Sequence, residues 1–328
     1  MSSLSPFQHG LSLIVFAAML WGTTGLTSKI LYRLSAVDAL SVGALRLLTA
    51  SPALLLLGQV TSPGSLRPLL RREWRAVCLM GLSMAAYNGC FFAALARTSV
   101  TAGTLLALCT APLFVALLAR VFLSEPLTRS VLLALAAGVT GTVLLVGGQG
   151  GRDVSALPSV AGLSLLRLDY ALGNLLALAA GLSYAAYALV GRAKSRNAPP
   201  ASLAASSFTA AAILLTPFAV SNGIRLPTNL PAWLAVLYLG LIPTALAYAL
   251  YLRGLKAVPA TIASIGTLVE PLTASLLAAL FLDERLTPGG LLGAALLLSS
   301  LVILVLRRDS SATCPPQGGF APRHDKTR

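Results

Sequence analysis

Long apolar stretches alternate with short polar segments along nearly the whole chain. About 20 apolar residues in helical form cross the hydrocarbon core of a bilayer. Stretches of roughly that length lie near residues 11–31, 38–58, 75–96, 101–123, 129–147, 170–191, 201–221, 232–253, 259–282 and 288–306. The pattern therefore predicts an all-α polytopic membrane protein with ten transmembrane helices.

The two halves of this pattern resemble each other at a constant offset. The segment ALCTAPLFVALLARVFLSEPLT (107–128) matches GTLVEPLTASLLAALFLDERLT (266–287), and EWRAVCLMGLSMAA (73–86) matches AWLAVLYLGLIPTA (232–245). Shared Trp, Pro, Glu and Thr residues carry the match, because Leu and Ala coincide by chance in apolar segments. Each half holds five helices, and since five is odd, the second copy enters the membrane from the opposite side. We expect two inverted five-helix repeats, a recurring plan of secondary transporters with the substrate site near the midplane.

Polar segments rich in Gly and Pro set the expected boundaries of the repeats. We assign the first repeat to residues 10–147, a flexible linker to 148–169, and the second repeat to 170–306. Residues 307–328 are polar and contain several Pro and Gly residues, so we expect a disordered tail.

Composition agrees with a membrane protein and argues against other classes. Apolar residues make up 56% of the chain and charged residues 10%, against about 25% charged in soluble domains. The net charge of +14 comes from Lys and Arg between the apolar segments and in the tail. No basic stretch is interleaved with aromatic residues as a nucleic-acid surface would be. We therefore expect a lipid bilayer and a small-molecule substrate as partners, and no nucleic acid.

The basic residues also predict the orientation. With ten spans, 16 of the 24 Lys and Arg residues lie on the side that holds both chain ends, 7 lie on the other side, and Arg46 lies within a span. By the positive-inside rule, both termini are expected in the cytoplasm. The first apolar stretch has no Lys or Arg upstream and is about twice as long as a signal-peptide core, so we expect a retained helix.

The sequence indicates no metal, cofactor or nucleotide site. Three of the four cysteines lie within predicted spans and the fourth lies in the tail, none with a close cysteine partner. His9 and His324 lie near opposite ends of the chain, and no phosphate-binding motif is present. We therefore expect transport without ATP and without any bound cofactor.

Several residues make the chain similar to a known family. Trp21-Gly22 lies in the first span, Arg46 in the second, and a Pro…Phe-Leu-x-Glu-x-Leu-Thr block occurs at 112–128 and again at 271–287. Together they resemble the EamA family of the drug/metabolite transporter superfamily, over residues 10 to 306. The stretches AAYNGCFFAAL and LSYAAYALV are similar to YddG-type exporters of aromatic and other amino acids. The resemblance implies ten helices in a bacterial inner membrane, both termini in the cytoplasm, and export of small metabolites.

Glu270 is the only acidic residue near the centre of a predicted span, and Pro271 follows it. A carboxylate at that depth is costly, so such residues are usually paired, protonated or exposed to a water-filled cavity. Proline removes a helix hydrogen bond and opens the helix locally. We expect Glu270 to contact substrate and to be the candidate for proton coupling, with Pro271 as a hinge. The alternative is a glutamate that only hydrogen-bonds to a neighbouring helix.

The matching position in the first repeat lacks the acid. Pro112 corresponds to Pro271 and is the second expected hinge, but Ala111 stands where Glu270 has its counterpart. We interpret the loss as chemical specialisation of the two halves.

Arg46 is the only cation within a predicted span, and it has two interpretations. It holds a substrate carboxylate through a bidentate contact, or it is a structural partner of Glu270 or of free backbone carbonyls. The sequence alone does not bring the two spans together.

Residues at the ends of the spans are expected to be structural. Glu125 and Glu284 end the fourth and ninth spans at the membrane surface, and Thr128 and Thr287 suit the N-caps of the helices that follow. The glycines of the fifth and tenth spans allow close helix contacts within the chain, so a monomer is the default expectation.

Aromatic and polar side chains gather on particular faces of the predicted spans. Helical spacing places Trp21 and Thr24 on one face of the first span, and Thr267 and Glu270 on one side of the ninth. The expected substrate-binding residues are Trp21, Tyr87, Asn88, Tyr184, Tyr187, Tyr248, Thr267 and Glu270. An aromatic cavity with few fixed charges suits amphipathic or zwitterionic metabolites. The alternative is that the polar residues only make packing contacts between helices.

The leading hypothesis is a secondary transporter that exports aromatic and other neutral amino acids, or similar metabolites, by alternating access. A passive channel is the alternative from another class, and it would show neither saturation nor counterflow. An enzyme is not favoured, because no nucleophile motif, histidine pair or metal cluster accompanies Glu270. A nucleotide-sugar carrier of the same superfamily would need several deep cations. An importer is a further alternative, because inverted repeats do not fix the direction.

Overall fold

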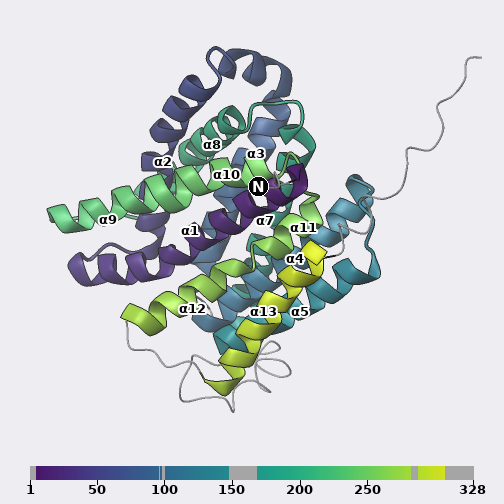
Figure 1. The fold of residues 1–328 in the computed structure, drawn as a ribbon. Helices are drawn as coiled ribbons and strands as arrows, with labels where there is room; N and C mark the ends of the chain where they lie inside the picture. The colour runs from purple at the N-terminus through teal and green to yellow at the C-terminus, as the bar shows by residue number, and fades with distance from the viewer. Residues whose placement is uncertain (1–4, 96, 98–99, 148–167, 282–286, 307–328) are drawn as a thin grey trace, which may run out of the picture.

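The structure, a computed structural model, describes residues 5–95, 97, 100–147, 168–281 and 287–306. Every regular element among them is a helix (Figure 1). The first repeat contains α1 (Pro6–Leu34), α2 (Ala39–Thr61), α3 (Leu66–Leu95), α4 (Val100–Phe122) and α5 (Arg129–Gly147). The second contains α7 (Leu168–Ser195), α8 (Pro200–Ser221), α9 (Leu230–Gly240), the π-helix η2 (Leu241–Leu246), α10 (Ala247–Gly254), α11 (Ala260–Gly266), α12 (Val269–Phe281) and α13 (Pro288–Leu306).

In the described part of the chain, ten helical spans are long and apolar enough to cross a membrane. The chain is therefore an all-α polytopic protein of two inverted five-helix repeats, as the sequence predicts. Two predicted spans differ in detail from the prediction. The span at 232–253 is interrupted by η2, which the sequence does not indicate. The span at 259–282 is interrupted between α11 and α12, just before the local opening expected at Pro271. The predicted linker lies almost wholly outside the described residues, and the predicted tail entirely so.

Local sequence explains where several helices begin. Ser5 and Gln8 form a capping box at the start of α1, with Pro6 at the first helical position. The side chain of Thr287 accepts a hydrogen bond from the Gly290 N–H at 3.1 Å, and Thr128 accepts one from Val131 at 3.4 Å. Both threonines therefore cap the helices that the sequence assigned to them. Glu284 lies outside the described residues.

The two repeats interlock by exchanging partners. In the first repeat α1 packs on α9, η2, α10 and α12 of the second, while α7 packs on α3 and α4 of the first. The helices α2 and α8 pack on each other, as do α5 and α13 (Figure 1). Gly141 and Gly293 bring α5 and α13 into backbone contact, since a Cβ at Gly141 would lie 2.7 Å from the Gly293 carbonyl oxygen. These glycines therefore serve packing within the chain.

The two ends of the bundle are packed differently. We call the membrane face at which α1 begins the N-terminal face. In α1 the buried residues run from Gly10 to Gly22, whereas none lies between Thr23 and Ile30. Six of the seven residues of α11 are buried, but only three of the thirteen in α12. In Figure 1 the far ends of α1, α9 and α12 diverge, whereas α1, α10 and α11 meet near the N-terminus. The halves of α1 and α12 toward the opposite face are therefore less buried than the N-terminal half of α1 and α11, although the α1–α2 and α8–α9 connections pack together at that face.

Candidate functional site

The break between α11 and α12 explains why a glutamate and a proline follow each other in mid-membrane. The helix ends at Gly266 and restarts at Val269, and the Glu270 N–H bonds to the Thr267 carbonyl at 3.0 Å. Pro271 thus falls in the first turn of α12, where backbone N–H groups have no partner within the helix. Glu270 occupies the same turn, where the helix dipole favours a negative charge. The break therefore accommodates Pro271 without the loss of a helix hydrogen bond and places Glu270 where a negative charge is favoured.

Glu270 is only half-buried, although it lies deep in the bundle, so its side chain borders an accessible space between helices. Arg46 of α2 and Tyr87 of α3 are half-buried as well. Arg46 and Glu270 lie within electrostatic range of each other and of Tyr87. The structure therefore gathers these three predicted residues around one region, which we call the central region.

Arg46 is anchored by a hydroxyl group. Its Nε donates to Oγ1 of Thr244 at 3.1 Å, and Thr244 in turn donates to the Leu239 carbonyl at 2.7 Å. Thr244 lies in η2, so the π-helix supplies the anchor of the guanidinium group. Among the described residues Arg46 and Glu270 form no direct ion pair; the pairs present are Arg192–Glu125 and Lys194–Glu73. Two opposite charges thus face one region without contact between them.

An aromatic cluster closes this region toward the N-terminal face. The Trp21 ring lies 4.7 Å from Tyr248, 5.4 Å from Tyr251 and 6.4 Å from Tyr184, between ring centroids. The Tyr184 ring also lies 5.9 Å from Tyr87. Residues from α1, α3, α7 and α10 therefore meet in one cluster, which holds four of the eight substrate-binding residues that the sequence proposes.

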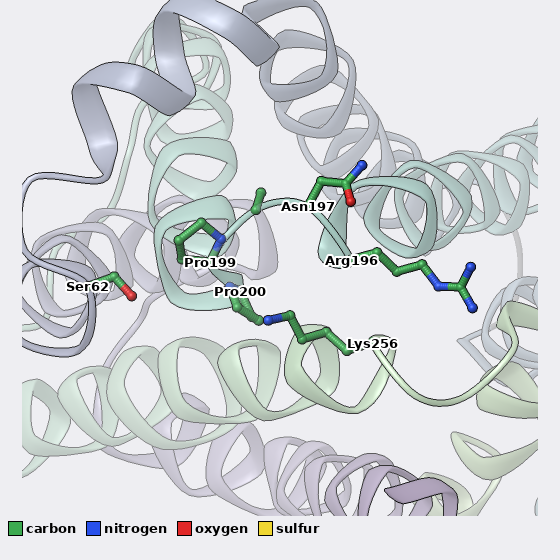
Figure 2. Close-up of a pocket in the computed structure, with 7 residues that line it drawn as sticks. Ser62, Arg196, Asn197, Pro199, Pro200 and Lys256 are labelled. Atoms are coloured by element: carbon green, nitrogen blue, oxygen red, sulfur yellow. The ribbon is translucent and has the colours of Figure 1, made fainter.

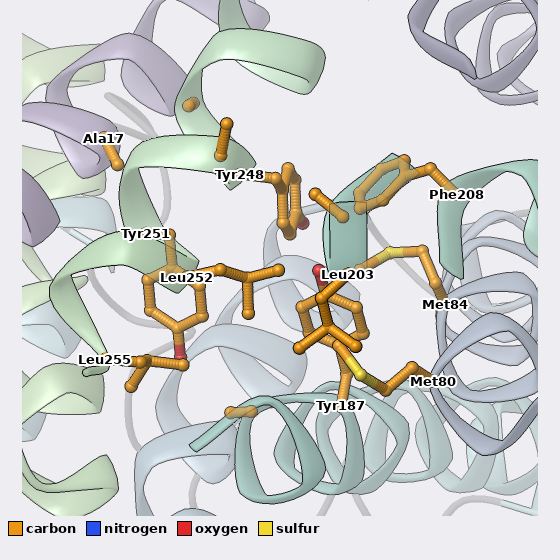
Figure 3. Close-up of a cluster of buried hydrophobic side chains, with 14 of the residues drawn as sticks. Ala17, Met80, Met84, Tyr187, Leu203, Phe208, Tyr248, Tyr251, Leu252 and Leu255 are labelled. Carbon is orange, nitrogen blue, oxygen red and sulfur yellow. The ribbon is translucent and has the colours of Figure 1, made fainter. Parts of the chain in front are cut away.

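Tyr187 lies behind this cluster and not at its surface. It is fully buried and packs edge-on against Phe208 and Tyr248 at 6.2 and 5.8 Å (Figure 3). Asn88 and Thr267 are also buried, and each donates to a carbonyl of its own chain segment, Met84 and Ser264 respectively, at 2.8 Å. These three buried residues therefore pack behind the residues that border the central region.

The cluster carries polar atoms that lack partners. Trp21 Nε1 and the hydroxyls of Tyr184, Tyr187 and Tyr251 are buried without a hydrogen bond of normal geometry. The Tyr184 and Tyr251 hydroxyls lie near each other, and the Tyr187 hydroxyl lies near Ser207, but outside that geometry. An unsatisfied buried donor costs about 1–3 kcal/mol.

The two predicted hinges differ. Pro271 lies at the start of α12, beside the break, whereas Pro112 lies inside α4, which continues to Phe122. Sequence reasoning also passed over Phe208 of α8, whose ring lies 4.6 Å from that of Tyr248. Apolar residues of a membrane span carry no signal that separates a cluster member from a lipid-facing one.

A cavity of about 330 Å³ opens at the N-terminal face (Figure 2). It lies between the end of α2, the α7–α8 connection and the α10–α11 connection, and it is lined by Ser62, Arg196, Asn197, Ala198, Pro199, Pro200 and Lys256. None of the proposed substrate-binding residues lines it, and its two cations are exposed. It is therefore separate from the central region.

Comparisons with known proteins agree with this architecture. The model of the EamA-like transporter family matches residues 8–147 and again 171–306, one match for each repeat. The chain is 35% identical over 291 residues to the uncharacterized transporter YwfM of Bacillus subtilis, covering 89% of this chain and 92% of that one. It is 28% identical over 298 residues to an uncharacterized transporter of Archaeoglobus fulgidus, covering 90% and 96% of the two chains.

One solved crystal structure shares the fold. It superimposes with a TM-score of 0.77 at 21% sequence identity, covering 93% of this chain and 99% of the other. Sequence and fold comparisons thus point to the same two-repeat architecture.

Proposed function

Since the chain belongs to the EamA-like transporter family, we propose that it is a secondary transporter that exports aromatic and other neutral amino acids, or similar small metabolites. Transport proceeds by alternating access of the two inverted repeats. The protein resides in a bacterial inner membrane with both termini in the cytoplasm, as the distribution of Lys and Arg favours.

The observation that carries the substrate proposal is a pair of unpaired opposite charges beside an aromatic cluster. Arg46 and Glu270 share one region without contact, so a zwitterion between them would satisfy both. The carboxylate of an amino acid suits the guanidinium group, which offers several donors in a fixed plane. The ammonium group suits Glu270, and the faces of Trp21 and Tyr184 attract both a cation and an apolar side chain.

The charge pattern favours amino acids over nucleotide sugars. A nucleotide sugar brings at least two phosphate charges, which call for several cations. Among the described residues of the central region, Arg46 is the only Lys or Arg. One cation and one anion match a molecule with one charge of each sign.

Glu270 is the candidate for energy coupling. It is the one acidic side chain of the central region among the described residues. Competition between a proton and a substrate ammonium group for this carboxylate would exchange one for the other across the membrane.

Counterflow in proteoliposomes tests the proposal. Vesicles that contain the purified protein are loaded with unlabelled phenylalanine, threonine or methionine and receive the labelled amino acid outside. We expect transient, saturable accumulation of label, stronger for phenylalanine. Glu73→Gln is the matched control, because it removes one partly exposed carboxylate at the N-terminal face, away from the proposed substrate-binding residues, and should transport normally.

Two results would contradict the proposal. Folded, inserted protein that gives no counterflow with any amino acid argues for a different substrate. Flux without saturation or counterflow argues for a passive channel. Export as the direction is tested by toxic amino-acid analogues, to which cells that produce the protein should become resistant.

A further inference from the structure

Glu125 lies at the N-terminal face, just past the end of α4, and its carboxylate binds the other repeat. Oε1 accepts a hydrogen bond from the Ala260 N–H at 2.8 Å. Oε2 accepts one from the Thr261 N–H at 3.0 Å and another from the Thr261 hydroxyl at 2.9 Å. Three donors of the second repeat thus converge on one side chain of the first.

This contact replaces a helix cap. The first N–H groups of a helix lack partners within it, and Pro259, at the N-cap of α11, makes no side-chain cap. Glu125 supplies both the acceptor atoms and the negative charge that the start of a helix favours. The start of α11 therefore depends on a residue from the other repeat.

Arg192 extends the contact to a third segment. Its Nε lies 3.8 Å from Oε1 of Glu125, and both side chains are only 11% exposed. One terminal nitrogen of the same guanidinium group donates to the carbonyls of Leu255 and Lys256, which join α10 to α11. The ends of α4, α7 and α10 and the start of α11 are thus fastened together. We call Glu125, Arg192, Ala260 and Thr261 the clamp.

The backbone before Glu125 adopts a conformation that side chains disfavour. Ser124 has φ = 53°, the only positive value among the described non-glycine residues. The left-handed region is unfavourable for a serine, and it persists only where surrounding contacts enforce it. Here it follows α4 directly and turns the chain so that Glu125 reaches α11.

The clamp is directly connected to the aromatic cluster. The Leu255 N–H bonds to the Tyr251 carbonyl at 2.9 Å, and the Tyr251 ring contacts Trp21 and Tyr184. Figure 3 shows Tyr251 and Leu255 on the same side of their helix. One helical turn therefore links the cluster to the carbonyl that Arg192 holds.

Closure at this face also depends on two glycines. A Cβ on Gly254 would lie 2.6 Å from the Gly10 carbonyl, so α1 and α10 touch through their backbones beside the clamp. The opposite half of α1, from Thr23 to Ile30, has no buried residue. The clamp therefore lies at the face where α1, α10 and α11 are most tightly packed.

We propose that Glu125 is the gate residue of the N-terminal face. Its carboxylate holds the two repeats together while the central region is open to the opposite face, and it must release Ala260 and Thr261 before substrate passes the N-terminal face. The inference rests on alternating access, which the proposed function assumes, and not on the identity of the substrate.

Thiol labelling with two reporters tests the gate. In protein without the four native cysteines, Ser264→Cys is the closed-half reporter, because Ser264 is fully buried on α11. Thr24→Cys is the open-half reporter, because Thr24 is half-buried in the loosely packed part of α1. An impermeant thiol reagent is applied to proteoliposomes of known orientation, with no substrate, so the result is independent of the counterflow assay.

The variant Glu125→Gln should shift the population toward opening at the N-terminal face. We expect labelling of the closed-half reporter from that face to rise about tenfold, the effect of losing one charge-assisted hydrogen bond. Labelling of the open-half reporter from the other face should fall. Thr261→Val removes only the hydroxyl and should give a smaller shift of the same sign. Glu73→Gln, which breaks the partly exposed pair with Lys194, is the matched control and should change neither rate.

Two outcomes would overturn the proposal. Unchanged labelling at both reporters in Glu125→Gln would mean that the clamp does not set the conformation. Faster labelling at both reporters would mean that Glu125 only stabilises the fold. Thr261→Val applies the same two criteria should Glu125→Gln fail to yield folded protein.

Discussion

The repeat-related segments α4 and α11–α12 share a proline, but they differ in continuity. Pro112 lies inside α4, which runs unbroken from Val100 to Phe122. Pro271 lies in the first turn of α12, after a break. The proline alone therefore does not break a membrane helix in this protein. The neighbouring residue, alanine in one copy and glutamate in the other, marks which copy has opened.

The partner helices show the same division. A Cβ at Gly181 of α7 would approach Thr110 and the Ala111 backbone, while one at Gly22 of α1 would lie 2.8 Å from the Glu270 carbonyl and 2.6 Å from Thr273. Each proline segment is thus packed against a glycine of the opposite repeat. In the first repeat the glycine contact lies against a continuous helix, α4. In the second repeat it lies against the broken segment α11–α12, at the turn that carries Glu270.

The largest effect is expected when the first copy is made like the second. Ala111→Glu places a carboxyl group at a buried position of a continuous helix, far from any helix start. We expect a loss of stability of about 3 kcal/mol, the penalty of a charge at mid-membrane depth. Thermal unfolding of the detergent-purified protein measures it, with Ala111→Ser as the near-neutral control. A variant as stable as wild type would show that the two segments are equivalent.

The converse change removes the acid from the second copy. Glu270→Gln keeps the size of the side chain but loses its charge, so binding of an ammonium group weakens. We expect kcat/KM in counterflow to fall by about 10- to 100-fold, for the loss of a charged hydrogen bond, and transport to lose its dependence on pH. Initial rates across a pH series measure both. Wild-type rates with wild-type pH dependence would remove Glu270 from the coupling mechanism.

A smaller effect is expected at Thr244, the residue of the second repeat that accepts a hydrogen bond from Arg46. Thr244→Val removes the hydroxyl that accepts from Arg46. The apparent KM for amino acid should rise about fivefold, the size of one hydrogen bond, with little change in stability. Thr209→Val is the control, because the Thr209 hydroxyl is buried without a hydrogen-bond partner. Equal KM values for the two variants would mean that Thr244 does not position Arg46.

The smallest effect separates the two prolines directly. Pro271→Ala changes a first-turn position that needs no N–H partner, so stability and transport should stay near wild type. Pro112→Ala restores a hydrogen bond in the interior of α4 and should stabilise the protein by about 1 kcal/mol. Thermal unfolding and counterflow, measured for both variants, test this difference. A larger change at Pro271 than at Pro112 would reverse the assignment of the two roles.

Helix number, repeat symmetry and capping could be predicted from the sequence, because they follow from apolar length and local chemistry. Thr128 and Thr287 are examples: a threonine before a helical run has one favourable use. The sequence predicts local opening at both prolines, but it does not show that only the segment of Pro271 breaks, since the two prolines look alike in sequence. The state of a helix around a proline depends on partners such as Gly22 and Gly181, which lie far away along the chain.

Among site residues, the sequence identified the types of side chain better than their positions. Trp21, Tyr87, Tyr184 and Tyr248 meet in one cluster, because their spacing fixes a helix face and packing brings the faces together. Tyr187 has the same spacing relative to Tyr184 but lies deeper, against Phe208. Glu125 was expected to be merely structural, because a glutamate at a helix end gives no sign that its partners lie in the other repeat.

The π-helix η2 determines which face of the eighth span carries Tyr248. A π-turn holds one more residue than an α-turn, and each residue of an α-helix advances the face by about 100°. The face of α10 that carries Tyr248 is therefore offset from the one that α9 alone would continue. If Leu241–Leu246 became regular α-helix without losing a residue, Tyr248 would rotate by about 100° away from Trp21, whereas deleting one residue there would leave a regular helix with Tyr248 near its present face. The arrangement of the aromatic cluster thus depends on how the backbone turns at this point and not only on which aromatic residues the chain contains.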